Sequence, residues 1–168
     1  MTQVPQDFKD FSKILLKQCI TRPDGISLIE QPEDGTPIFV QKLLDSPYQP
    51  LHCWHNCAKY LELNGGSVVF GWALFYDAEM YQAQHHAIWC SPEGSFVDIT
   101  PDELSSVTEI MFLPDGRVPY DYTNHRHPAN CFYSPGYPLK WWIAGLNNPD
   151  GTPAIQPFCY WVKRNPDA

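Results

Sequence analysis

The sequence predicts an α+β fold, in which one helix carries a reactive thiol and packs on a small antiparallel sheet. A run free of glycine and proline, from Leu51 to Asn64, ends at Gly65 and Gly66 as helices commonly do. The stretches that follow, up to residue 114, are rich in β-branched and aromatic residues and are separated by turn residues. A helix followed by such strands is an α+β arrangement.

Length and composition indicate one folding unit. The chain has 168 residues, of which 43% are hydrophobic, and this suits a single domain with its own core. We expect this domain to span 1–168, with a core at about 50–115. An N-terminal helical extension is expected at 1–49, and an irregular, aromatic and proline-rich part at 116–168.

The elements before the core follow from local patterns. Apolar residues at helical spacing predict an amphipathic helix over about 6–19. The turn-rich segment after it is expected to hold one short strand around 26–30. A short helix is expected from Ile38, and it stops before Pro47 because the residue before a proline disfavours the helical conformation. The central helix is placed at about 52–63.

Four strands are expected after the central helix, at 66–78, 85–91, 95–100 and 108–114. The chain from residue 115 onward is expected to be mostly irregular, because proline, tyrosine and asparagine are frequent there.

Charge and segment composition argue against several classes of partner. The formal net charge of -8 disfavours a nucleic-acid partner, since phosphate backbones are bound by basic surfaces. The N-terminus has no basic leader followed by an apolar run, and no stretch reaches the roughly 20 apolar residues of a membrane span. The six cysteines are neither dense nor regularly spaced, so we expect free thiols in a reducing cytoplasm. We expect no cofactor.

One predicted hairpin places a histidine beside an aspartate. Residues 92–94, Pro-Glu-Gly, suit a three-residue loop with a left-handed glycine at its end. In that register Ile88 lies opposite Asp98, so His86 shares a face with Asp98. A two- or four-residue loop would put His85 on that face instead.

A thiol at the start of the central helix completes a catalytic set. A helix N-terminus lowers the pKa of a thiol, and a neighbouring imidazole activates the thiol further. Cys53 lies in the first turn, whereas Cys57 lies one turn deeper, where the effect of the helix dipole has faded. We therefore predict Cys53 as nucleophile, His86 as base and Asp98 as the group that orients His86, and Cys57 and His85 remain alternatives.

These residues resemble a known superfamily. The pair "CW" that opens a helix, then "HAIW" on a strand and "VDITP" on the next, is similar to the papain-like superfamily and within it the transglutaminase-like branch. The resemblance covers about residues 50–115, and the same string resembles a group of small uncharacterised bacterial proteins. It implies a papain-like core and a thiol-dependent hydrolase or acyltransferase. The substrate it implies is an amide or thioester, such as a peptide or protein.

The resemblance leaves one part of the site without a counterpart. The glutamine that donates to the oxyanion in papain-like proteases has no equivalent at the expected offset, although Gln49 lies nearby. The backbone N–H of Cys53 is the remaining donor. We assign Gln49, Trp54 and Trp89 to substrate binding.

Two other classes compete with the enzyme. The first is an inactive protein of the same fold that binds a partner. The second is a zinc-stabilised module, since histidines and cysteines gather at His52, Cys53, His55, Cys57, His85, His86 and Cys90. Only residues three or four apart share a face of a helix, so this segment gives no compact two-plus-two zinc spacing, and we predict no metal site.

Overall fold

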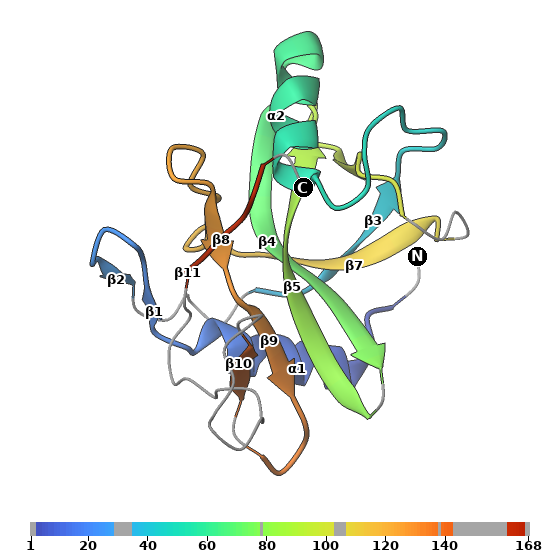
Figure 1. The fold of residues 1–168 in the computed structure, drawn as a ribbon. Helices are drawn as coiled ribbons and strands as arrows, with labels where there is room; N and C mark the ends of the chain where they lie inside the picture. The colour runs from blue at the N-terminus through green and yellow to red at the C-terminus, as the bar shows by residue number, and fades with distance from the viewer. Residues whose placement is uncertain are drawn as a thin grey trace.

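The computed structural model describes residues 3–28, 35–77, 79–102, 107–137, 139–142 and 161–166. Figure 1 shows their arrangement. The helices and strands, in chain order, are α1 (Gln6–Leu16), β1 (Ile20–Thr21), β2 (Ser27–Leu28), β3 (Ile38–Lys42), α2 (Cys53–Asn64), β4 (Ser67–Asp77), β5 (Met80–Cys90), β6 (Phe96–Asp98), β7 (Glu109–Pro114), β8 (Arg126–Pro128), β9 (Asn130–Tyr133), β10 (Lys140–Trp142) and β11 (Trp161–Lys163).

The core is a closed barrel of five strands, and this contradicts the predicted α+β class with a papain-like core. The strands run in the order β5, β4, β7, β3 and β6, and β6 pairs with β5 to close the ring. All these pairs are antiparallel except β3 with β6, so the barrel is mixed. The described residues hold eleven strands and two helices, so the fold is mostly β.

The prediction failed chiefly at β3, which was expected to be a short helix. Its five residues pair with β7 on one edge and with β6 on the other, and this double pairing closes the barrel. The segment begins Ile38, Phe39, Val40, which favours a strand, but a short apolar run by itself does not distinguish helix from strand. Gly71 of β4 lets the barrel wall close tightly, because a Cβ there would clash with the Leu113 carbonyl of β7.

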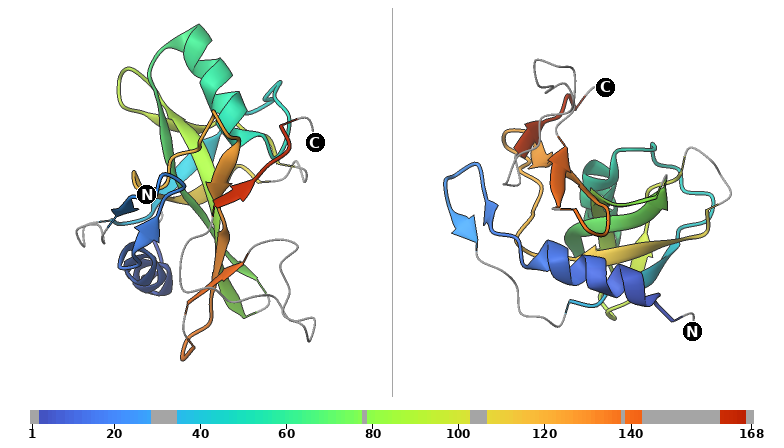
Figure 2. Two further views of the ribbon diagram at one scale, coloured as in Figure 1. Left: turned by 60° about the vertical axis from the view of Figure 1, so that its left-hand side comes forward. Right: turned by 90° about the horizontal axis from the view of Figure 1, so that it is seen from below.

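The two helices pack on opposite ends of the outer face of β4 and β5 (Figures 1 and 2). Apolar residues of α1, including Phe11 and Leu15, pack against Trp72 of β4 and Ala83 of β5. Residues of α2 pack against the other end, where Ala87 belongs to the same buried cluster as Cys53, Trp54 and Cys57. The N-terminal end of α2 is thereby held against the middle of β5.

Four short strands, β8 to β11, lie within the described portions of the C-terminal part 116–168. Strands β9 and β10 extend the sheet from β5, while β8 pairs with β11. Positions 143–160 of that part lie outside the described residues. Strand β11 brings the last described residues to the N-terminal end of α2 (Figure 1). No helix in the described ranges is long and apolar enough to cross a membrane.

Candidate active site

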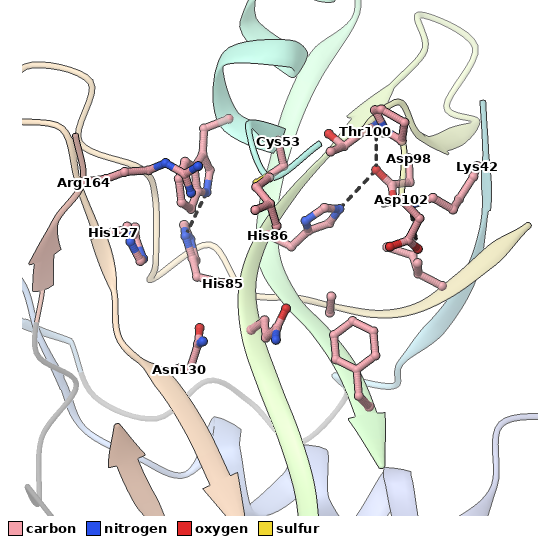
Figure 3. Close-up of a pocket in the computed structure, with 17 residues that line it drawn as sticks. Lys42, Cys53, His85, His86, Asp98, Thr100, Asp102, His127, Asn130 and Arg164 are labelled. Carbon is pink, nitrogen blue, oxygen red and sulfur yellow. Dashed lines mark hydrogen bonds and ion pairs between the residues drawn. The ribbon is translucent and has the colours of Figure 1, made fainter. Parts of the chain in front are cut away.

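A break in the pairing of β5 opens the site. Along the edge of β5 that faces away from β4, β9 pairs at positions 81–83 and β6 pairs at 89–90. Within the described chain, positions 84–88 have no strand partner on this edge. The N-terminal end of α2 lies over this break, and a cavity of about 300 Å³ opens beside it. Figure 3 shows the side chains that line the cavity on the two sides of β5.

Cys53 is the first residue of α2 and lines the cavity, with only 4% of its surface exposed. No side chain caps the helix at His52, so first-turn N–H groups are not engaged by a capping oxygen. The chain enters the helix through Leu51, whose φ of 62° is uncommon for a residue with a side chain. Backbone strain of this kind is often found at functional sites.

Asn56 fixes the turn that precedes Cys53. Its amide Nδ2 donates to the Gln49 carbonyl at 2.8 Å and to Oγ1 of Thr100 at 3.2 Å. These bonds tie the start of α2 to the chain immediately after β6. Cys53 is therefore held in register with Asp98, the last residue of that strand.

The His86 ring lies between Cys53 and Asp98 (Figure 3). Its Nε2 is 3.1 Å from Oδ1 of Asp98 in an ion pair whose N–H is not aligned for a hydrogen bond to that oxygen. Burial by itself would lower the pKa of His86. The negative charges of Cys53 and Asp98 outweigh burial and raise that pKa to about 10.

The hairpin register predicted from the turn residues is confirmed. Trp89 pairs with Val97, and the N–H of Ser91 donates to the Ser95 carbonyl at 2.8 Å, as a loop at 92–94 requires. Gly94 has a φ of 87°, the left-handed conformation expected for it. This register puts His86, and not His85, on the face of Asp98.

Asp98 is fully buried, and its two carboxylate oxygens accept hydrogen bonds from different residues. Oδ1 accepts from the backbone N–H of Thr100 at 3.0 Å, and Oδ2 accepts from Nζ of Lys42 at 2.7 Å. Burial would raise the pKa of this carboxyl, but His86 and then Lys42 hold it below its usual value. Lys42 reaches Asp98 because the two residues are partners in the parallel pair of β3 and β6.

His85 has a structural role that is distinct from that of its neighbour. Its Nδ1 accepts from Nε1 of Trp54 at 3.0 Å, so Nε2 carries the hydrogen and donates to the Val118 carbonyl at 2.5 Å. Burial lowers the pKa of His85 well below its usual value. Both ring nitrogens are thus engaged in a neutral imidazole, and His85 is not available as a base for Cys53.

Cys57 faces away from the cavity and is fully buried. Its Sγ donates to the Ala87 carbonyl at 3.4 Å, within the unpaired part of β5. Burial, followed by the charges of Cys53 and Asp98, raises the pKa of the Cys57 thiol well above its usual value. The thiol therefore stays protonated and donates to the Ala87 carbonyl, in the part of β5 where no described strand pairs on this edge.

The residues predicted to bind substrate lie in different places. Trp54 lines the cavity, whereas Gln49 and Trp89 do not. The Gln49 carbonyl accepts from Asn56, as described above. Trp89 donates from Nε1 to the Gly65 carbonyl at 2.8 Å, at the far end of α2.

The side of the cavity across β5 was not predicted from the sequence. It carries three polar side chains from elements that are remote in sequence: His127, Asn130 and Arg164. Gln84 of β5 lines the cavity as well, on the face of β5 that His86 occupies. His127 stacks on Trp54 with ring centroids 4.6 Å apart. The sequence offered one signal, the alternation along β5, because Gln84 is two positions from His86 and shares its face. Nothing local pointed to the other three.

The described residues hold no group of three or more histidines, cysteines or acids placed to bind a metal ion. Of the residues weighed for a zinc site, Cys53 lies beside His86 (Figure 3), and the rings of His52 and His55 lie 6.4 Å apart. The His55 ring instead contacts Tyr120 and Tyr122.

The function of the site is argued from its geometry, because the comparisons with other proteins give no family. No protein-family model matches the chain, no curated protein matches it significantly, and no solved structure does.

Proposed function

We propose that the protein is a thiol-dependent acyl hydrolase or acyltransferase that acts on an amide or thioester. The observation that carries the proposal is the His86 ring, held between the Cys53 thiol and the buried Asp98 carboxylate at the wall of a cavity. A nucleophile, a base and an orienting group in such contact are the recurring arrangement of covalent acyl transfer. The raised pKa of His86 supports an imidazole that is protonated at neutral pH and can give a proton to a leaving group.

The reaction then runs in two steps. In the first, Sγ of Cys53 attacks the carbonyl carbon of the substrate while His86 holds the thiol proton, and the C–S bond forms as the tetrahedral adduct develops. The adduct collapses when the bond to the leaving group breaks, and His86 gives its proton to the departing amine or thiolate. In the second step, water or an amine attacks the thioester, and His86 takes up a proton from this attacking group. The C–S bond then breaks, and Cys53 leaves as the thiolate.

The developing oxyanion needs donors that are in place before the reaction. The backbone N–H of Cys53, at an uncapped helix N-terminus, is the first of these. The side-chain amide of Gln84 lines the same cavity and comes from the same face of β5 as His86. We assign Gln84 as the second donor, in the role for which Gln49 was considered from the sequence.

The test is site-resolved labelling that does not need the natural substrate. An activated ester such as p-nitrophenyl acetate should give a burst of nitrophenol and an acetyl group on Cys53, located by mass spectrometry. His86→Gln should slow the burst by about 100-fold or more, since general base catalysis contributes 10²–10⁴-fold. Cys57→Ala is the matched control and should retain the burst. Acetylation spread evenly over the cysteines would overturn the proposal.

A further inference from the structure

Arg164 places a positive charge at the wall of the same cavity as Cys53. It follows β11 directly, and its backbone N–H donates to the His125 carbonyl at 2.8 Å. Its guanidinium carbon lies 5.1 Å from the centroid of the Trp54 ring. Trp54 is the residue next to the thiol, and its own ring is fixed by the hydrogen bond to His85. The guanidinium is thus positioned by a rigid aromatic platform.

This charge has no counter-charge in the described part of the chain. No described carboxylate lies within ion-pair distance of Arg164, and its buried Nε has no hydrogen-bond partner. The titratable groups whose pKa its charge shifts include His55, Tyr120 and His127, none of which is a carboxyl group. Acidic residues are not scarce, since the chain carries 19 of them against 11 lysines and arginines.

A partly buried arginine without a partner is costly unless something else pairs with it. A guanidinium that rests on an aromatic ring still presents its edge N–H groups, and these match a carboxylate in a two-pronged hydrogen bond. The Asn130 amide lines the same cavity and offers a further donor there. The wall across β5 from His86 therefore has the composition of a carboxylate site.

We propose that Arg164 binds a carboxylate of the acyl substrate, so that the enzyme acts on acyl groups that carry a negative charge. This inference rests on the proposed function, because it takes Cys53 as the reacting group. The carboxylate belongs either to an acidic side chain or to a free α-carboxyl group near the reacting carbonyl. Both sources offer the same planar anion to Arg164, and the experiment separates them.

The test uses chloroacetyl probes, which alkylate a thiol with loss of chloride and need no acyl transfer. One matched pair is chloroacetyl-glycine and chloroacetyl-glycinamide, which differ in the α-carboxylate. The other is the α-amides of chloroacetyl-glutamate and chloroacetyl-glutamine, which differ in the side chain. The rate of Cys53 alkylation is measured for each probe by mass spectrometry.

We expect the acidic member of at least one pair to react faster by about 10- to 100-fold. This is the fold-change that corresponds to the free energy of one hydrogen bond to a charged group. The pair that shows the preference identifies the source of the carboxylate. Arg164→Gln should abolish the preference, and Arg164→Lys should retain part of it, since lysine keeps the charge without the fork. Arg126→Gln is the matched control: it removes a charge from neighbouring β8, outside the cavity, and should keep the full preference.

The outcomes separate this inference from the proposed function. If Cys53 reacts faster than the other cysteines but does not distinguish acid from amide, the carboxylate site is overturned and the proposed function stands. A preference for the acidic probe that persists in Arg164→Gln also overturns the carboxylate site. If no probe favours Cys53, the proposed function itself fails. Should Arg164→Gln not fold, as judged by circular dichroism, a preference in Arg164→Lys equal to that of the unmodified protein overturns the two-pronged contact.

Discussion

Nζ of Lys42 lies 2.7 Å from Oδ2 of Asp98, so the carboxylate that faces His86 also pairs with a lysine of β3. Both side chains are almost inaccessible, at 9% and 0% exposure, so solvent screens the contact little. Lys42 thereby holds Asp98 ionised and in place on the side opposite His86. We regard Lys42 as a positioning residue, because it acts on the reacting groups only through Asp98.

Removal of the Lys42 ammonium should destabilise the fold. Lys42→Met leaves the buried Asp98 with two of its three partners, so we expect a loss of about 1.5–3 kcal/mol in the free energy of unfolding. Urea denaturation measures it. Lys59→Met, on the exposed face of α2, is the control and should change stability by less than about 0.5 kcal/mol. Equal effects of the two substitutions would contradict the role of Lys42.

The loss of stability at acid pH should depend on Asp98. Its pKa is lower in the folded than in the unfolded state, so the stability it contributes is present above about pH 4, the unfolded pKa, and is lost as the pH falls further. Asp98→Asn should therefore be less stable than the unmodified protein at neutral pH, and the gap should narrow below about pH 4. Urea denaturation across this range checks it, and a gap independent of pH would contradict it.

The loss of stability at alkaline pH should depend on His86, because the folded state raises the pKa of this group instead of lowering it. Its folded pKa of about 10 lies above the unfolded value, so the stability it contributes is complete below about pH 6.5 and is lost as the pH rises toward 10. A nuclear magnetic resonance titration of the His86 ring should show no protonation step between about pH 5 and 8. In Cys53→Ser the step should move to lower pH, because one of the negative charges is gone. A midpoint near the usual histidine value in the unmodified protein would contradict the ion pair.

Cys57 should matter for stability and not for reactivity. Cys57→Ala leaves the buried Ala87 carbonyl without its donor, and we expect a loss of about 1–3 kcal/mol in the free energy of unfolding. Cys57→Ser supplies a hydroxyl donor and should recover part of that loss. Alkylation of Cys53 by iodoacetamide, followed by mass spectrometry, should proceed at the same rate in both variants. A large drop in that rate would show that Cys57 takes part in the chemistry.

Local sequence determined the parts of the site that depend on neighbouring residues. The run free of glycine and proline fixed α2 to within a residue or two, and so placed Cys53 at its first turn. The turn at residues 92–94 fixed the register of β5 and β6, because the side-chain period of a strand is two and the loop length sets the parity. His86 and Asp98 therefore came out on one face before any tertiary contact was known.

The tertiary structure decided the barrel and the rest of the cavity. β3 is a strand because β6 and β7 offer it two edges, and these contacts join segments more than fifty residues apart, which no local pattern encodes. The same closure brings Lys42 to Asp98, and the pairing of β11 with β8 brings Arg164 to Trp54. The sequence by itself determined which residues form the proposed catalytic set. Long-range strand pairing decided which charges surround them, because charge interactions depend on distance in space and not on separation along the chain.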